Sequence, residues 1–135
     1  MMRIRIKLLM LAALLAVGGS SASTADLYVI CNAHISLTAA DVRDVFLGEK
    51  QFAGALKLVP IDNSAAQALF LDRVLKMTAA KYSVTWIKKS FRDGINPPVV
   101  AGSDAEALAT VRRTPGACSY VTTPPEDKVE VVARL

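Results

Sequence analysis

The side chains best suited to metal binding or nucleophilic chemistry are two cysteines and the single histidine of the chain. Cys31 and His34 stand in a C-x-x-H spacing, and Cys118 would be a third ligand. Zinc sites usually combine tighter pairs with a fourth ligand at a recognisable spacing, and a Cys–His nucleophile pair is an equally weak signal. A polar loop histidine is the favoured interpretation. Because the sequence also has no nucleophile elbow, HExxH, Walker A loop or GxGxxG, we expect a protein that is not an enzyme and has neither metal nor cofactor.

A second candidate site is the stretch Asp62-Asn63-Ser64, which has the composition of a turn. Residues 57–61 alternate polar and apolar side chains, as a short strand does. Ser64 followed by Gln67 matches a capping box, so a helix is expected from Ala65 to about Met77. A loop that ends on a helix N-terminus presents free backbone N–H groups, and this arrangement binds anions. It is also how an ordinary strand-to-helix turn is built.

Further elements can be placed around this loop from periodicity and caps. The other predicted strands are Leu27–Cys31, Ala117–Thr122 and Val129–Ala133. The other predicted helices follow Thr38 (with Asp41, closed by Gly48), Thr78 (closed by Gly94) and Ser103 (with Glu106, bearing Ala105, Leu108 and Val111). The order β-α-β-α-α-α-β-β predicts an α/β fold with helices packed on a small mixed sheet.

The helix after Thr78 carries a set of large apolar side chains, namely Tyr82, Trp86, Ile87 and Phe91. At helical spacing such a set is more typical of a core than of a stacking platform for bases or ligands. The charged residues Lys88, Lys89, Arg92 and Arg112-Arg113 are expected on solvated faces.

The first 25 residues have the features of an export signal. Arg3, Arg5 and Lys7 precede the apolar run Leu8–Val17, and small residues lead to a predicted cleavage after Ala25. The apolar run is about half of the ~20 residues that a membrane-spanning helix needs, so no membrane insertion is expected. Residues 26–135 are then one periplasmic domain.

Removal of the signal changes the charge balance. The whole chain has 16 Lys+Arg and 12 Asp+Glu, and three of the bases but none of the acids lie in the signal. The remaining 13 bases and 12 acids leave a net charge of +1. Without a basic stripe interleaved with aromatic residues, we expect no nucleic-acid binding. In an oxidising compartment the two cysteines either form a disulfide or stay as buried free thiols.

Three stretches together resemble one known family. Residues 37–50 (LTAADVRDVFLGEK), 58–70 (LVPIDNSAAQALF) and 102–122 (GSDAEALATVRRTPGACSYVT) are similar, in this order, to the second lobe of the periplasmic phosphate-binding proteins of ABC transporters. The resemblance implies a single lobe of the type II periplasmic-binding-protein fold. It also implies that the strands carrying Cys31 and Cys118 run close together, which favours the disulfide.

Carried over to the loop, the resemblance implies a phosphate-contacting segment, Asp62–Ala66. Asp62 matches the aspartate that accepts the proton of phosphate, and Ser64 matches a serine that donates to the anion.

Four positions depart from the family pattern. Asn63 and Ala65 stand at glycines, Ala66 replaces a threonine, and Pro60 replaces the arginine that would bind the anion in a bidentate way. These departures predict weak binding of phosphate or another small anion, near millimolar.

Two functions follow from these observations. The first is a periplasmic solute-binding-like protein related to phosphate ABC transporter substrate-binding proteins. The alternative is a periplasmic interaction module that uses the same fold to dock on a porin, transporter or sensor.

Overall fold

The computed structural model describes residues 25–125 and 128–135, so the predicted export signal lies almost wholly outside the described residues. The strands are β1 (Tyr28–Asn32), β2 (Phe52–Ala53), β3 (Leu56–Lys57), β4 (Val59–Asn63), β5 (Val99–Ala101), β6 (Ala117–Val121) and β7 (Val129–Arg134). The helices are α1 (Asp41–Phe46), α2 (Gln67–Phe70), the π-helical turn η1 (Leu71–Leu75), α3 (Ala79–Asp93) and α4 (Asp104–Arg113). In the described residues no helix is long and apolar enough to cross a membrane.

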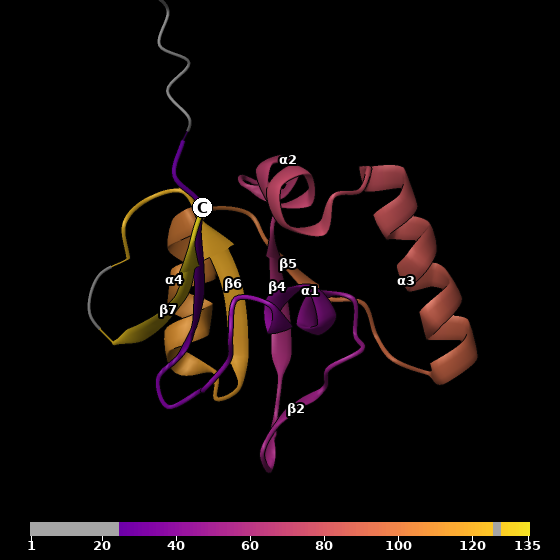
Figure 1. Ribbon diagram of the computed structural model, residues 1–135, viewed down its shortest axis with the longest axis horizontal. Coiled ribbons are helices and arrows are strands. Elements are labelled where there is room, and N and C mark those ends of the chain that lie inside the picture. Colours follow the sequence, from indigo (N-terminus) through magenta and orange to yellow (C-terminus); the bar gives the residue numbers. More distant parts are fainter. Residues whose placement is uncertain (1–24, 126–127) are drawn as a thin grey trace, which may run out of the picture.

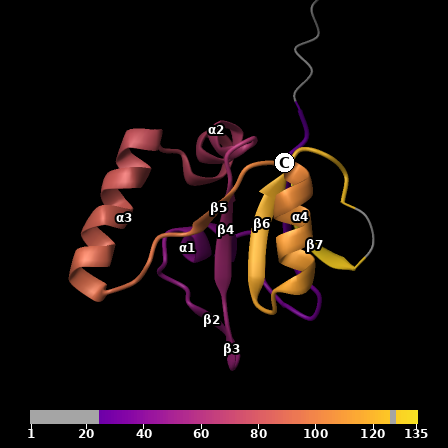
Figure 2. The same ribbon diagram turned by 180° about the vertical axis from the view of Figure 1, so that it is seen from behind.

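The centre of the fold is a mixed sheet in the order β5-β4-β6-β1-β7. Strand β4 is parallel to β5 and β6, whereas β1 is antiparallel to β6 and β7. Helix α4 covers one face of the sheet, and α3 stands beside the β5 edge, as the two opposite views show (Figures 1 and 2). This mixed α/β architecture confirms the fold class expected from the sequence.

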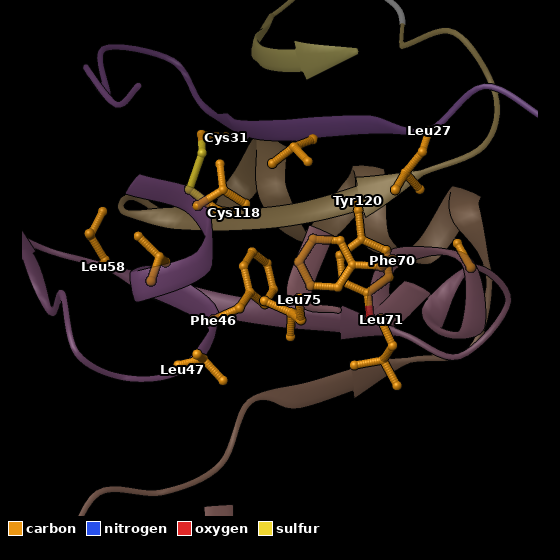
Figure 3. Packing of buried hydrophobic residues seen from close by; sticks show 14 of the residues in the cluster. Leu27, Cys31, Phe46, Leu47, Leu58, Phe70, Leu71, Leu75, Cys118 and Tyr120 are labelled. Carbon is orange, nitrogen blue, oxygen red and sulfur yellow. A yellow bond between two sulfur atoms is a disulfide. The ribbon is translucent and has the colours of Figure 1, made fainter. Parts of the chain in front are cut away.

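Two apolar cores lie on the two faces of the sheet. The larger contains side chains of α1, α2 and η1, with Phe70 stacked on Tyr120 at a centroid distance of 4.0 Å and Phe46 edge-on to Phe70 at 4.7 Å (Figure 3). The smaller is built by α4, whose Ala107 and Val111 are fully buried. Of the three apolar residues singled out on this helix from the sequence, Val111 is buried and Ala105 is exposed.

Cys31 and Cys118 face each other across β1 and β6 and form a disulfide, with their Cα atoms 4.0 Å apart (Figure 3). This confirms the predicted pairing. Because the bond uses both thiols, the alternative in which they join His34 as metal ligands or as a nucleophile is lost. His34 is exposed and has a left-handed backbone with φ of 73°.

The N-caps Thr78 and Ser103 are confirmed, because each side chain accepts the N–H three residues on. Thr38 and Asp41 also exchange the two bonds of a capping box, although regular helix begins only at Asp41. Gly94 ends α3 in the left-handed region with φ of 65°, as predicted.

The prediction for the helix after β4 is wrong at its start. Ser64 does not cap it: the helix begins at Gln67 after an N-cap at Ala66, which has no side-chain bond to offer. The strand runs on through Asp62 and Asn63, and the Ser64 N–H still bonds to the Ala101 carbonyl at 2.9 Å. The hydrogen bond from the Ser64 N–H to strand β5 therefore outweighs the local tendency of Ser64 to cap a helix.

Helix α3 also differs from the prediction. Tyr82 and Trp86 are buried as expected, but Ile87 is 57% exposed and Phe91 is 92% exposed. Lys89, expected in solvent, is buried, and its Nζ donates to the Leu47 carbonyl at 2.7 Å.

Candidate functional site

The predicted anion loop lies where β4 ends and the chain turns towards α2. Asp62 is only 3% exposed, and both of its carboxylate oxygens are already hydrogen-bonded. The Tyr82 hydroxyl of α3 donates to one oxygen and the Tyr120 hydroxyl of β6 donates to the other, each at 2.8 Å. The carboxylate thus connects α3 to the sheet.

The three titratable groups of this network perturb one another. Burial raises the pKa of Asp62, and the hydrogen bonds from Tyr120 and Tyr82 only partly oppose that rise. Burial, followed by the nearby Asp62 charge, raises the pKa of both tyrosines far above the ordinary value. The tyrosines are therefore neutral donors at any physiological pH, and Asp62 is the group whose charge can change.

Asn63 is fully buried and organises the other side of the loop. Its Nδ2 donates to an Asp104 carboxylate oxygen at 2.7 Å and to the Tyr120 carbonyl at 2.9 Å. The second Asp104 oxygen accepts the Thr122 hydroxyl at 2.6 Å. Although burial opposes it, these bonds from Thr122 and Asn63 lower the pKa of Asp104. Asn63 therefore joins β4, β6 and α4. The sequence did not predict this structural role.

The backbone donors of the loop are engaged within the chain. The Ser64 N–H goes to Ala101, the Ala65 N–H to the Asn63 side-chain oxygen at 3.1 Å, and the Ala66 N–H to the Asn63 carbonyl at 3.0 Å. Ser64 and Ala65 are exposed, whereas Ala66 is buried. An anion at this loop would have to displace internal bonds or rely on the Ser64 hydroxyl.

A hollow of about 560 Å³ opens next to Asp62. One wall is the Trp86, Ile87 and Phe91 side of α3, and the other includes Val100 of β5. Asp62 is the only ionisable acid or base other than tyrosine among the described residues that line it, so this hollow offers no cation to a phosphate. The lining is mostly apolar and suits an uncharged group.

No group of three or more His, Cys, Asp or Glu side chains that could hold a metal occurs in the described part of the chain. No local sequence pattern identifies the tyrosine partners of Asp62, because Tyr82 is 20 residues away and Tyr120 is 58 residues away.

Comparison with known proteins gives a likeness of fold. No protein-family model matches the chain. No curated protein matches it either. The structure is similar to that of a protein from Clostridium perfringens assigned as a phosphate ABC transporter substrate-binding protein and solved with bound phosphate, with a TM-score of 0.59 and 16% sequence identity over 80% of this chain and 45% of that one. It is also similar to PstS from Borrelia burgdorferi, with a TM-score of 0.52 and 19% identity over 72% of this chain and 41% of that one. The chain therefore spans less than half the length of these solved structures and shares their fold.

Proposed function

We propose that this chain is an exported, non-enzymatic protein of the periplasm, solute-binding-like in fold, that works as an interaction module. Its partner is a membrane transporter, porin or sensor. The supporting comparisons are the likeness to phosphate ABC transporter substrate-binding proteins and the disulfide, which is typical of oxidising compartments.

The observation that carries the proposal is a set of apolar side chains in water beside the hollow. On α3, Ile87 is 57% exposed and Phe91 is 92% exposed; on β5, Val99 is 68% exposed and Val100 is 56% exposed. Full burial of one such side chain is worth about 1.5–3 kcal/mol, so a partner that covers this patch gains several kcal/mol. Contiguous exposed apolar residues with a polar surround mark interaction surfaces.

Crosslinking in cells tests this role. A photo-reactive phenylalanine analogue at position 91 should give a discrete crosslinked product containing a membrane transporter, porin or sensor. The same analogue at the exposed Ala109, on α4 at the other face of the sheet, is the control and should give none. Identical products from both positions, or none from position 91, would contradict the interaction role.

A second candidate is weak binding of phosphate or another small anion at Asp62–Ala66. It is favoured by the phosphate in the Clostridium perfringens structure and by the exposure of Ser64 at the end of β4. Millimolar affinity requires about −4.1 kcal/mol and micromolar about −8.2 kcal/mol. With the backbone donors engaged and Asp62 repelling an ionised anion, we expect no better than the millimolar value.

Calorimetry of residues 26–135 with phosphate and sulfate measures this affinity. Ser64→Ala should abolish whatever heat is observed while leaving stability nearly unchanged, since Ser64 caps no helix. A micromolar dissociation constant on a verified monomer would make anion capture the main function.

A further inference from the structure

A partner of the kind proposed above must be held by specific contacts. The β5 edge of the sheet offers backbone hydrogen-bonding groups for this purpose. Strand β5 is the last strand on its side of the sheet in the described residues. Hydrogen bonds in a parallel pair come from alternate residues, and the Ala101 carbonyl bonds towards β4 by accepting the Ser64 N–H. The N–H and C=O of Val100, the residue before it, therefore face away from β4. An exposed edge of this kind can pair with another chain.

The two edges of the sheet differ in how they are protected. The opposite edge strand, β7, carries Glu130 and Arg134, and charges of this kind discourage pairing with another strand. Strand β5 has the sequence Val-Val-Ala, and Val99 and Val100 are both exposed. Pro97 and Pro98 precede it and limit any added pairing to a short segment.

The hollow of about 560 Å³ lies between α3 and β5, so side chains of an added strand would enter it. Its walls are contributed by Ile87 and Phe91 on one side and Val100 on the other. A second hollow of about 500 Å³ shares Trp86, Pro97 and Pro98 with the first and lies along the same edge. An extended segment that pairs with β5 would therefore meet apolar walls at both ends of its contact.

The second hollow and the exposed side of α3 carry basic side chains, whereas the acid that lines the first hollow, Asp62, is buried and bonded to two tyrosines. Lys50 and Lys57 line the second hollow, and Lys88 is exposed on α3 next to the Ile87 and Phe91 stripe. Arg92 also lies on this helix, where it is paired with Asp93 at 3.1 Å. This arrangement complements acidic residues on either side of an apolar anchor.

We propose that the α3–β5 groove binds an extended, acidic and apolar segment of a partner protein by strand addition. The segment pairs with the outward N–H and C=O of Val100 and places an apolar side chain against Ile87 and Phe91. Its acidic flanks lie near the lysines. A second copy of this chain fits the groove less well, because two α3 helices would bring Lys88 and Arg92 close to the same residues of the other copy.

Selection of peptides tests the proposal directly. Residues 26–135 are used to enrich a random 12-residue library displayed on phage, and enriched sequences are synthesised. We expect an apolar residue at the centre, Asp or Glu at the flanks, and protection of the Val100 amide from hydrogen exchange when the peptide is added.

The variant Val100→Pro removes the outward N–H without breaking a bond to β4, although it also restricts φ and replaces the side chain. Its matched control, Val100→Thr, changes the side chain but keeps the N–H. We expect Val100→Pro to weaken peptide binding at least tenfold and Val100→Thr to weaken it less than threefold, with thermal melting showing that both are folded. Replacement of the peptide residue opposite Val100 by its N-methyl form should reproduce the loss.

Three outcomes overturn the proposal, the first two by refuting strand addition and the third by refuting the proposed occupant. The first is a peptide that binds Val100→Pro as tightly as the unchanged protein. The second is a bound peptide that contacts Phe91 but leaves the Val100 amide unprotected, which would leave the interaction role intact and refute only this mode. The third is a dimer in light scattering that Val100→Pro dissociates, because the occupant would then be a second copy. Failure of the position-91 crosslinking described above, with peptide binding retained, would instead count against the wider interaction role.

Discussion

The hydrogen bond from Tyr82 to Asp62 offers a sharp test of how α3 is held on the sheet. Tyr82→Phe removes the hydroxyl and leaves one oxygen of a carboxylate that is 3% exposed without this donor. A hydrogen bond to a charged group contributes about 1.5–3 kcal/mol, whereas one between neutral groups contributes about 0.5–1.5 kcal/mol. We therefore expect a loss of about 1.5–3 kcal/mol on the high-pH side of the Asp62 titration, where the carboxylate is ionised.

The burial of Asp62 determines the direction of the pH dependence. The folded pKa of Asp62 is raised above its ordinary value of 3.8. The stability contributed by this group is therefore fully present below that value and is lost as pH rises through the folded pKa. Tyr82→Phe removes a hydrogen bond that lowers this pKa, so its cost should fall to about 0.5–1.5 kcal/mol on the low-pH side of the titration, where the carboxyl is neutral.

Urea denaturation of residues 26–135 at pH 4, 6 and 8 measures both effects. The matched control is Tyr28→Phe, because Tyr28 is also buried but its hydroxyl donates only a long hydrogen bond, 3.4 Å, to the exposed Asp26. In an Asp62→Asn background the cost of Tyr82→Phe should no longer depend on pH. A cost below about 0.5 kcal/mol at pH 8, equal to that of the control, would refute the reasoning.

Three further predictions concern other parts of the fold. Reduction of the Cys31–Cys118 bond, which closes a separation of 87 residues, should cost about 4–5 kcal/mol by loop entropy, measured by urea denaturation with and without reductant; two titratable thiols in the unreduced, denatured protein would contradict it. Gly116→Ala should cost at least about 2 kcal/mol, because φ is +83° and the new Cβ would lie 2.0 Å from the Lys57 carbonyl oxygen; a thermal melt unchanged from the parent would show the turn to be adaptable. Lys89→Met should cost about 1.5–3 kcal/mol in urea denaturation by leaving a buried carbonyl without its charged donor, and an unchanged midpoint would contradict that role.

The sequence predicts those parts of the fold that depend on residues close together. Thr78 and Ser103 cap their helices through bonds to residues three positions on, so the caps can be identified locally. Strand β5 has only three residues and no alternation of burial, and it was missed for that reason. The start of the helix after β4 was placed wrongly because the Ser64 N–H bonds to Ala101, a partner that local patterns cannot reveal.

The candidate site shows the same limit. Asp62 could be identified from its place near the predicted strand end, but it lies within β4, and its two tyrosine partners come from α3 and β6 at no recognisable spacing in the sequence. Helix α3 is different, because helical periodicity does account for its burial pattern. Lys89 lies seven residues after Tyr82 and three after Trp86, so it shares their buried face, whereas Phe91 lies nine residues after Tyr82, on the opposite side of the helix.

The pairing of the two ends of the domain has a mechanical consequence. Leu27 and Leu135 exchange two backbone hydrogen bonds, and β1 and β7 run antiparallel from there. Tension applied at these two residues would peel the strands apart one pair at a time until it reached Cys31. From there the load would pass through the disulfide to Cys118 and out along the C-terminal segment. Residues 32–117, with α3, β5 and the groove between them, form a covalently closed loop outside this path, so tension at the ends cannot extend them while the disulfide is intact.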